Sequence, residues 1–498
     1  MGTSGPAAIT TDAAGRAVHR LLPLPRSIEP GEGSLTLTAQ TRIAIGAGIG
    51  GFDHTVNHLI GDVQQATGLH LARTAVATAG DITLQLGGGP DVHGEEGYEL
   101  LIDPNGAILR AGHPHGLWNA TRTLVQLFAH VPGDATLASM RIIDRPRYVW
   151  RGAMLDVARH FFGVDQVLRF IELIARFKIN RLHLHLTDDQ GWRIAIDGWP
   201  TLTSIGGRTA TGHDSGGWFS RAEYREIVAH AARHFITIVP EVDMPGHTHA
   251  ALASVPALNL SGTSPSLYTD IPRDLASVGF SSLHLEAPAT RRLISDVIAQ
   301  MAADTPGKFL HIGGDEANAT GAAEYSEFIG LLQREVHSHG KQMVGWEEIA
   351  RTALLPGALV QHWLDAETAR RAPGSARFVM SPSAHTYLDM KHTPSSRVGR
   401  RWAGFIDVDA AYGWDPAVLI DGIADDRIEG VEAPLWTEKV ATFEDVQHLC
   451  FPRLACLAEV GWTAQHLRHW DGFRPRLAVH AQRLEEIGVP VHRSALLD

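Results

Sequence analysis

From residue 148 onward the chain repeats one order of segments: a short apolar run, a loop and an amphipathic helix. The run "RLHLHL" precedes "AEYREIVAHAARH", for example, and "FLHIGG" precedes "AAEYSEFIGLLQREVHSHG". This alternation is typical of parallel strands joined by crossover helices. Eight candidate strands follow in order, at residues 152–157, 181–186, 236–242, 309–314, 342–346, 358–363, 376–381 and 428–436. Eight such units predict an α/β fold, a (β/α)8 TIM barrel.

The segment before the barrel has a different texture. Short runs such as "SLTLTAQTRIAI", "DITLQL" and "GYELLI" read as strands by their period of two and their branched side chains, and two helices are expected at residues 54–68 and 116–130. This mixture predicts a smaller α+β domain. We therefore expect a flexible N-terminus at 1–17, an α+β accessory domain at 18–147 and a catalytic barrel at 148–498.

Charge and hydropathy exclude some classes of partner. The formal net charge is −12, and no Lys/Arg run is longer than Arg400–Arg401, so we expect no nucleic-acid partner. The chain has no stretch of about 18 apolar residues, and its start lacks a basic patch followed by an apolar run. We therefore expect neither a membrane span nor a signal peptide in this sequence. Compartment and oligomeric state stay open.

The chain has two cysteines, Cys450 and Cys456, which lie six residues apart in what reads as one helix. Six positions correspond to about 240° around a helix axis, so the side chains point apart. We expect two buried free thiols rather than a disulfide.

Acids and tryptophans gather where the expected barrel strands end, and Asp315 and Glu316 stand side by side in "HIGGDEA". Carboxylates accept hydrogen bonds from hydroxyls, and indole faces cover the apolar face of a pyranose. In a barrel of this kind the chemistry collects at the carboxyl ends of the strands. The pattern predicts a sugar site. It contains no glycine-rich phosphate loop, and we expect no cofactor.

Six motifs in order carry a resemblance to a known family: "RGAMLDVARHFF", "LHLHLTDDQGWR", "EVDMPGHTHA", "LHIGGDEA", "YLDMKH" and "EAPLWTE". Together they resemble the family 20 glycoside hydrolases, the β-N-acetylhexosaminidases, and above all their bacterial members. The likeness covers the whole barrel, and the preceding α+β unit is similar to that family's accessory domain. The substrate that the resemblance implies is a carbohydrate with a terminal β-linked 2-acetamido sugar.

The resemblance also accounts for the two adjacent acids. In the usual retaining glycosidase, two carboxyls about 5–5.5 Å apart act on opposite faces of one sugar, which neighbours in sequence are poorly placed to do. In family 20 the 2-acetamido oxygen of the substrate attacks C1 and forms an oxazolinium-type intermediate. By this likeness Glu316 is the general acid and then the base, Asp315 orients the acetamido N–H, and Tyr387 hydrogen-bonds the attacking oxygen.

The remaining site residues follow from the same motifs. Tryptophans would wall the acetamido group and the ring, an arginine and two acids would bind hydroxyls, and an aspartate and a histidine would lie behind Glu316. No residue is expected to bind a metal. The resemblance thus implies substrate-binding roles for Arg159, Asp188, His247, Trp346, Trp363, Asp389, Trp436 and Glu438.

Other interpretations of these residues stay open. The acidic pair could stand at a helix N-terminus, where the helix dipole favours it. "HLHL", followed by Asp243, His247, His249 and Asp315, is superficially like the metal ligands of amidohydrolase barrels. Those enzymes carry His-x-His on the first strand, however, and here it falls on the second. A non-catalytic sugar-binding protein on the same scaffold is the third possibility.

Two segments depart from the family pattern or lie outside it. Bacterial relatives often carry an aromatic residue at the position of His392, and the segment 392–402 is unusually basic. The long loop at 257–288 could shape the site for the leaving group. The sequence does not predict the preference between GlcNAc and GalNAc, or the natural glycan.

Overall fold

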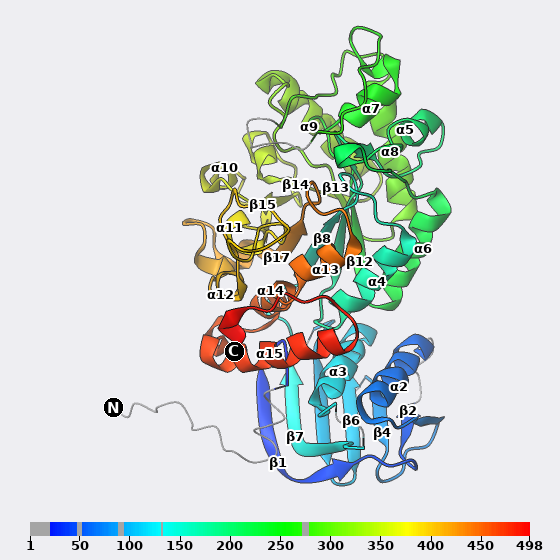
Figure 1. The fold of residues 1–498 in the computed structure, drawn as a ribbon, viewed down its shortest axis with the longest axis vertical. Coiled ribbons are helices and arrows are strands. Elements are labelled where there is room, and N and C mark those ends of the chain that lie inside the picture. Colours follow the sequence, from blue (N-terminus) through cyan, green and yellow to red (C-terminus); the bar gives the residue numbers. More distant parts are fainter. Residues whose placement is uncertain (1–19, 47–51, 88–93, 131–132, 271–277) are drawn as a thin grey trace.

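A computed structural model describes residues 20–46, 52–87, 94–130, 133–270 and 278–498. The chain forms a sheet domain followed by a closed barrel, and helices α2 and α3 of the first domain lie between its sheet and the barrel (Figure 1). The expected flexible N-terminus, 1–17, lies outside the described residues.

The first domain is built on a seven-stranded mixed sheet with the order β1-β7-β5-β6-β4-β2-β3. The run expected at 34–45 is two strands, because the chain turns at 37–41 and the second part crosses to the other side of the sheet. Its β7, which pairs antiparallel with β1 and β5, has no counterpart among the strands expected from the sequence. The elements are β1 Ser27–Thr36, β2 Arg42–Ile45, α2 Asp53–Thr67, β3 Ala72–Thr74, β4 Ile82–Leu86, β5 Tyr98–Asp103, β6 Gly106–Ala111, α3 Pro114–Leu127 and β7 Thr136–Asp144.

Eight parallel strands close the barrel, and each coincides with one of the eight predicted runs. The first and last strands, β8 and β17, pair over six residues, which completes the ring. The strands are β8 Trp150–Asp156, β9 Arg181–His185, β12 Thr237–Glu241, β13 Phe309–His311, β14 Gln342–Trp346, β15 Leu359–His362, β16 Arg377–Met380 and β17 Ile428–Leu435. The predicted fold class is confirmed.

Amphipathic helices cover the barrel. Helix α4 shows why they dock: Val167, Phe170, Ile171 and Ile174 recur at helical spacing and are buried against the strands. The further elements are α4 Val164–Ala175, β10 Thr187–Asp188, β11 Gly191–Trp192, α5 Pro200–Ser204, α6 Arg221–Arg233, α7 His249–Ser254, α8 Thr290–Asp304, α9 Ala322–Ser338, α10 Ala366–Arg370, α11 Ser383–Thr386, α12 Val408–Tyr412, α13 Phe443–Cys450, α14 Arg453–Trp462 and α15 Trp470–Glu486. Among the described helices, none has the length and apolar character that a membrane crossing requires.

The two cysteines are buried and free, as expected, but they do not share a helix. Helix α13 ends at Cys450 and α14 begins at Arg453, with Pro452 between them. Proline has no N–H to donate and disfavours helical geometry in the residue before it, so the helical pattern breaks there. The prediction of one continuous helix was wrong.

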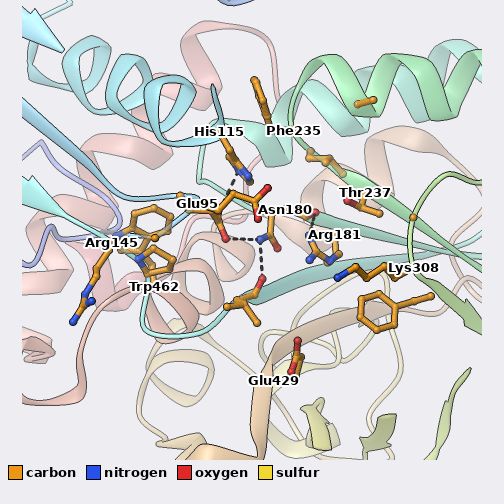
Figure 2. A pocket seen from close by; sticks show the side chains of 18 of the residues that line it. Glu95, His115, Arg145, Asn180, Arg181, Phe235, Thr237, Lys308, Glu429 and Trp462 are labelled. Carbon is orange, nitrogen blue, oxygen red and sulfur yellow. Dashed lines mark hydrogen bonds and ion pairs between the residues drawn. The ribbon is translucent and has the colours of Figure 1, made fainter. Parts of the chain in front are cut away.

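A large cavity lies between the two domains, at the amino-terminal ends of the barrel strands (Figure 2). It measures about 970 Å³, and its lining includes Arg181 and Thr237, which start strands β9 and β12, together with His115 of the first domain. The clustered acids lie at the opposite end of the barrel. Size alone therefore does not mark the reactive end.

Candidate active site

The loop that carries the adjacent acids starts where β13 ends. Gly313 and Gly314 have φ angles of 67° and 90°, which favour glycine. A Cβ atom on Gly313 would lie 1.7 Å from Oδ1 of Asp243, so no other residue fits there. The same Asp243 oxygen accepts the N–H of Gly314 at 3.0 Å. The two glycines thus let the loops after β12 and β13 come together.

The acids themselves do not cap a helix. Residues Asp315 and Glu316 leave the strand in a loop, and α9 begins only at Ala322. Glu316 itself has a positive φ of 45°, which a residue with a side chain adopts only when its surroundings hold it there. The helix-terminus interpretation is therefore wrong, and the expected strand-to-loop position is confirmed.

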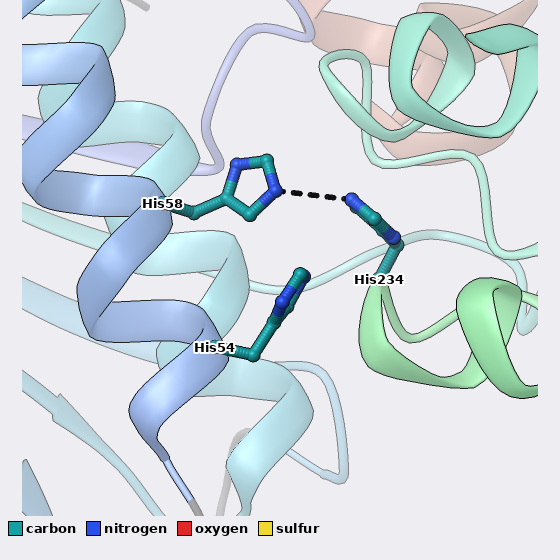
Figure 3. A group of neighbouring side chains, drawn as sticks. All are labelled: His54, His58 and His234. Atoms are coloured by element: carbon teal, nitrogen blue, oxygen red, sulfur yellow. Dashed lines mark hydrogen bonds between the residues drawn. The ribbon is translucent and has the colours of Figure 1, made fainter. Parts of the chain in front are cut away.

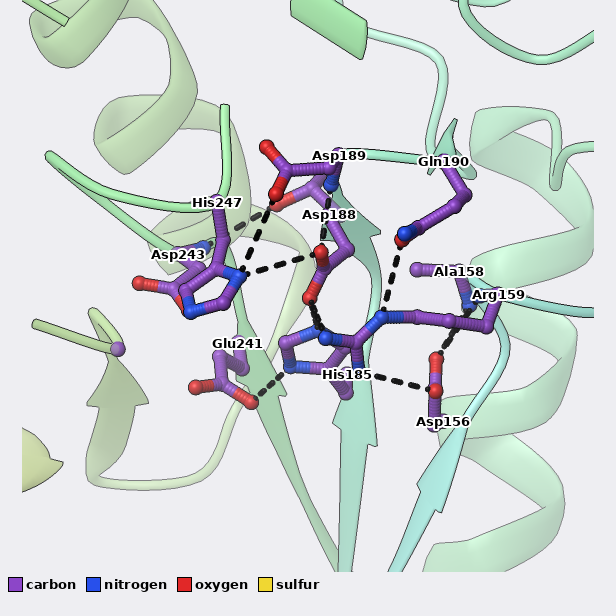
Figure 4. A network of polar contacts seen from close by, with 12 residues as sticks. Asp156, Ala158, Arg159, His185, Asp188, Asp189, Gln190, Glu241, Asp243 and His247 are labelled. Atoms are coloured by element: carbon purple, nitrogen blue, oxygen red, sulfur yellow. Dashed lines mark hydrogen bonds and ion pairs between the residues drawn. The ribbon is translucent and has the colours of Figure 1, made fainter. Parts of the chain in front are cut away.

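One histidine faces both acids. The Nε2 atom of His247 lies 3.3 Å from Oε2 of Glu316 and 3.5 Å from Oδ2 of Asp315. On its other side, Nδ1 of His247 lies 3.3 Å from Oδ1 of Asp188 (Figure 4). His247 therefore connects Asp188, which is almost fully buried, with the two acids at the cavity.

Asp188 in turn is held by cations. Its Oδ2 atom lies 2.6 Å from a guanidinium nitrogen of Arg159 and 2.8 Å from Nε2 of His185 (Figure 4). Burial alone would raise the pKa of Asp188, but Arg159, His247 and His185 more than offset it and hold the pKa well below its usual range. Asp188 is a stable anion behind His247.

The charges on His247 and Asp315 follow from this surrounding. Burial lowers the pKa of His247, but Asp188 and Asp315 more than offset burial and raise it well above its usual value, so the ring is an imidazolium. Burial raises the pKa of Asp315 to about 6; His247 opposes this shift, and Glu316 adds to it. Burial and repulsion from Asp315 also raise the pKa of Asp243, which favours a neutral carboxyl there. The carboxyl groups of the site thus differ in their pKa values, which are lowered for Asp188 and raised for Asp315 and Asp243.

Ten of the eleven site residues expected from the sequence line one cavity at the carboxyl ends of the strands. Asp188 is the exception, because it lies behind His247. The lining consists of Arg159, His247, Val278, Asp315, Glu316, Trp346, Trp363, Tyr387, Asp389, Arg400, Trp402, Trp436 and Glu438.

Aromatic rings make up much of the wall. The Trp346 indole donates to Oε1 of Glu241 at 2.8 Å, and the Trp363 indole donates to Oε2 of Glu348 at 3.2 Å. The Tyr387 ring stacks near Trp363 with 6.3 Å between centroids. Because carboxylates behind the wall hold the indole N–H groups, the ring faces keep fixed orientations. Such a wall can enclose an apolar methyl group or a sugar face.

Polar atoms in the same wall lack partners within the described structure. Both carboxyl oxygens of Asp389, Oε2 of Glu438 and Oδ1 of Asp315 are buried without a hydrogen bond. Burial and the nearby Glu438 raise the pKa of Asp389 well above its usual value. Unpaired buried polar groups are costly, so acceptors gathered around a cavity indicate a ligand that brings hydroxyl and N–H donors.

Three lining residues were missed in the sequence analysis: Val278, which lies in the loop at 257–288, and the pair Arg400 and Trp402. A guanidinium nitrogen of Arg400 lies 3.1 Å from Oε1 of Glu438, and the Trp402 ring lies 5.6 Å from the ring of Tyr387, edge to face. Both belong to the basic segment 392–402, whose unusual composition was the available signal. His392 does not line the cavity: its ring is buried and stacks on His492 at 3.8 Å.

The His-x-His pair of β9 is committed to carboxylates. His183 lies 2.8 Å from Glu432 and 2.9 Å from Glu241, while His185 lies 2.5 Å from Glu241 and 2.8 Å from Asp188. Each ring nitrogen thus faces an acid, and these contacts account for both histidines without the metal that the amidohydrolase interpretation requires. They buttress the acids and Trp346 instead.

Comparisons with known proteins agree with this geometry. The catalytic-domain model of glycosyl hydrolase family 20 matches residues 148–465, and that family's domain 2 matches 18–145. A β-N-acetylhexosaminidase of Cellulomonas fimi is 42% identical over 407 residues, 80% of this chain and 81% of that protein.

Solved structures extend the likeness to the whole fold. The family 20 β-N-acetylhexosaminidase of Streptomyces coelicolor superposes with a TM-score of 0.91 at 40% identity, over 96% of this chain and 98% of the other. A mutant Streptomyces plicatus β-hexosaminidase in complex with its product, GlcNAc, superposes with a TM-score of 0.90 at 42% identity, over 99% and 98% of the two chains. With the motifs, the barrel and the paired acids in agreement, this chain belongs to glycosyl hydrolase family 20.

Proposed function

We propose that this protein is an exo-acting β-N-acetylhexosaminidase that removes terminal β-linked GlcNAc or GalNAc with retention of configuration. The activity of the Cellulomonas fimi relative and the GlcNAc bound to the Streptomyces plicatus enzyme support a 2-acetamido sugar as the substrate. The nucleophile in this proposal is the acetamido oxygen of the substrate.

The observation that carries the mechanism is the shared contact of the two acids. Asp315 and Glu316 both approach the same nitrogen of His247, at 3.5 and 3.3 Å. Two carboxyls held toward one atom are poorly placed to act on opposite faces of a sugar, as a protein nucleophile and an acid must. A nucleophile that the substrate brings resolves this geometry.

In the first step Glu316 gives its proton to the glycosidic oxygen while the acetamido oxygen attacks C1. The bond between C1 and the leaving group breaks, and a cyclic oxazolinium forms. Asp315 accepts a hydrogen bond from the acetamido N–H and stabilises the positive charge. The Tyr387 hydroxyl, whose pKa burial and Asp389 raise well above its usual value, stays protonated and donates to the attacking oxygen.

In the second step a water molecule attacks C1 from the face that the leaving group vacated. Glu316, now a carboxylate, removes a proton from this water, and the oxazolinium ring opens to restore the acetamido group. Two displacements at C1 give a product of the same anomeric configuration. His247 and Asp188 serve as positioning residues, because they hold the side chains of Glu316 and Asp315 in place.

Recognition of the rest of the sugar falls to the remaining wall. Trp346 and Trp363 enclose the acetamido methyl, and Trp436 covers the ring. The ring hydroxyls donate hydrogen bonds to Asp389 and Glu438 and accept one from Arg159. The unpartnered oxygens of Asp389 and Glu438 support this role. A pocket that surrounds one terminal sugar favours exo action.

The test is the release of 4-nitrophenol from its β-N-acetylglucosaminide and from the plain β-glucoside with one enzyme preparation. Rapid release from the first and almost none from the second is expected, because the glucoside has no acetamido nucleophile. NMR of the first-formed sugar should show the β anomer. Similar rates on both substrates, or an inverted product, would rule out participation of the acetamido group.

A further inference from the structure

Four histidines face one another across the interface between the two domains, far from the acids. His54 and His58 lie one turn apart on α2 of the first domain and face His234, which directly follows α6 of the barrel (Figure 3). His230 lies one turn before His234 on α6. Residues four apart on a helix share a face, so each helix presents a pair of imidazoles to the other. The sequence shows each pair but not that they meet.

Three of these rings are arranged as metal ligands are. The Nε2 atoms of His58 and His234 lie 3.1 Å apart (Figure 3), and one nitrogen from each of His54, His58 and His234 lies within 4.8 Å of the others. In a tetrahedral zinc site with Zn–N bonds of about 2.0–2.1 Å, ligand nitrogens lie about 3.3 Å apart. The three nitrogens thus lie near the spacing that a zinc ion needs.

Ring orientation supports convergence. The three ring pairs have centroids 4.6, 4.7 and 4.9 Å apart and meet at steep interplanar angles of 61°, 79° and 80°. Lone pairs lie in the ring plane, so rings at steep angles can direct them to one point. In the second histidine cluster, His392 and His492 stack with an interplanar angle of 10°, which keeps their lone pairs parallel.

The inner nitrogens of His58 and His234 are hydrogen-bonded to each other, a contact that an ion placed between them would replace. Nδ1 of His234 lies 3.0 Å from the carbonyl oxygen of His230, to which it donates, so its Nε2 carries the lone pair. In metal sites a histidine ligand usually donates its other ring N–H to a carbonyl or carboxylate oxygen, and this hydrogen bond orients the ring toward the metal. Nε2 of His54 and Nε2 of His230 are buried and have no hydrogen-bond partner in the described structure.

Burial keeps the histidine rings of the cluster neutral, and the charged residues around them carry only a small net positive charge. Burial lowers the pKa of His58 to about 4 and of His234 to about 3. Three guanidiniums, from Arg122, Arg176 and Arg233, act on the cluster and oppose a cation, whereas Asp62 and Glu172 favour one. Arg122 is already paired with Asp62 at 2.5 Å, which neutralises the guanidinium that acts most strongly on His58.

We propose that His54, His58 and His234 bind a divalent transition-metal ion, Zn²⁺ first of all, with water or His230 in the fourth position. Imidazole ligands suit zinc, copper and nickel and do not suit Mg²⁺ or Ca²⁺. Because two ligands come from α2 and one from the end of α6, the ion joins the accessory domain to the barrel. Its role is structural, because the hydrolysis site lies at the other end of the strands.

The test uses the full chain without a histidine tag, stripped with a chelator and dialysed. Titration calorimetry with Zn²⁺ should show one tight equivalent per chain, and thermal unfolding should shift upward by a few degrees with Zn²⁺ but not with Mg²⁺. Co²⁺ should give the visible absorption of a four-coordinate ion. Zinc should leave the hydrolysis of the 4-nitrophenyl substrate nearly unchanged.

Variants localise the ion. His58→Gln should weaken zinc binding by roughly 10-fold or more and abolish the thermal shift. His54→Gln, at a half-buried position, should do the same with less risk to folding. The matched controls are His448→Gln in the second histidine cluster and His337→Gln on the exposed face of α9, which should bind zinc as the parent does.

Two outcomes overturn the proposal. One is a parent protein that takes up no zinc at micromolar concentration. The other is a tight equivalent that persists in both His54→Gln and His58→Gln, since the ion would then lie elsewhere. Circular dichroism of each chelated variant shows that it is folded, so a loss of binding is read only from folded protein.

Discussion

His247 holds its Nε2 atom 3.3 Å from Oε2 of Glu316, and it does so as an imidazolium, because Asp188 on its far side raises its pKa. The proposed acid therefore works beside a fixed positive charge rather than in an apolar pocket. Through His247, the buried Asp188 thus acts on the residue that transfers the proton, and Glu316 and Asp188 can be tested separately.

Glu316→Gln should lose most where the leaving group needs protonation. We expect kcat/KM for N,N′-diacetylchitobiose to fall by roughly 10²–10⁴-fold, the usual contribution of a general acid. A good leaving group such as 4-nitrophenolate needs little protonation in the first step, so its formation of the intermediate should suffer much less. Steady-state kinetics on both substrates decide the matter; equal losses would mean that Glu316 is not the acid.

Asp315→Asn should exchange activity for stability. The pKa of Asp315 is raised from 3.8 to about 6 by burial, so the folded state holds this proton more tightly than the unfolded state. The stability that this proton provides is present below pH 3.8 and is lost as the pH rises through about 6. The neutral amide avoids that loss.

At pH 7 we therefore expect Asp315→Asn to be more stable than the parent, by on the order of 1–3 kcal/mol, with the difference vanishing near pH 4. Turnover should fall by roughly 10²–10⁴-fold, because the amide cannot serve the acetamido N–H in the same way. Thermal unfolding of both proteins from pH 4 to 7 measures the first effect. If the stability that Asp315→Asn gains over the parent were smaller at pH 7 than at pH 4, the pKa of Asp315 would not be raised by folding.

Most of the site follows from motifs, because each motif places residues at a strand end and the barrel then brings strand ends together. Glu316, Tyr387 and Trp436 reach one cavity for this reason. Arg400 and Trp402 lie in a loop after β16 that folds back to the cavity. Backbone hydrogen bonds hold the loop there; the Arg400 N–H, for example, donates to the carbonyl oxygen of Asp389 at 2.7 Å. No periodicity predicts such a return.

Other features depend on contacts between segments that lie far apart in the chain, and no local pattern encodes them. Strand β7 was missed although "TLASMRIID" has an apolar run, since its partner β1 lies about a hundred residues earlier in the chain. The meeting of His58 with His234 likewise requires α2 to dock on the barrel. Local pattern predicts elements and strand ends; it does not predict which distant surfaces touch.

Asp188→Asn should make activity depend on pH in a new way. Without the Asp188 charge the pKa of His247 should fall toward its ordinary value near 6.5, so the ring loses its charge at pH 8. The ratio of variant to parent kcat should then drop by on the order of 10–30-fold between pH 5.5 and pH 8. The measurement is kcat of the variant and of the parent at both pH values, and the ratio at pH 5.5 is the control for the ratio at pH 8. A ratio that stays constant would show that Asp188 acts through structure alone.

Asp389→Asn should weaken substrate binding more than it slows the chemistry. Both oxygens of this buried carboxyl lack partners, and we assign them to a sugar hydroxyl. A hydrogen bond to such a group contributes roughly 1.5–3 kcal/mol, so KM should rise by roughly 10–100-fold while kcat changes less. The free protein should not lose stability, because the raised pKa of Asp389 favours a neutral carboxyl, which a neutral amide replaces at little cost. A large fall in kcat at constant KM would place Asp389 among the reacting groups instead.

The domain interface offers a stability test that leaves the active site untouched. Arg151 at the start of the barrel is fully buried, and its guanidinium pairs with Glu96 of the first domain, with one contact at 3.2 Å. Glu96 also accepts from Asn180 at 2.9 Å and lies 3.3 Å from His115. One carboxylate of the first domain thus accepts hydrogen bonds from two barrel residues and lies beside a histidine of its own domain.

Glu96→Ala should therefore lower the free energy of unfolding by about 3–5 kcal/mol, because it leaves the Arg151 guanidinium buried without its counter-charge. The matched control is Glu327→Ala, which removes an ion pair of similar length, 2.8 Å to Arg291, whose side chains are 60% and 55% exposed. Exposed pairs contribute about 0–1 kcal/mol, so this change should be nearly silent. Urea unfolding of the three proteins gives the comparison. If Glu96→Ala unfolds at the same urea concentration as the control, the buried pair does not hold the domains together, and other contacts, such as the packing around Trp118 and Trp462 and the buried Lys178–Asp144 pair, do so.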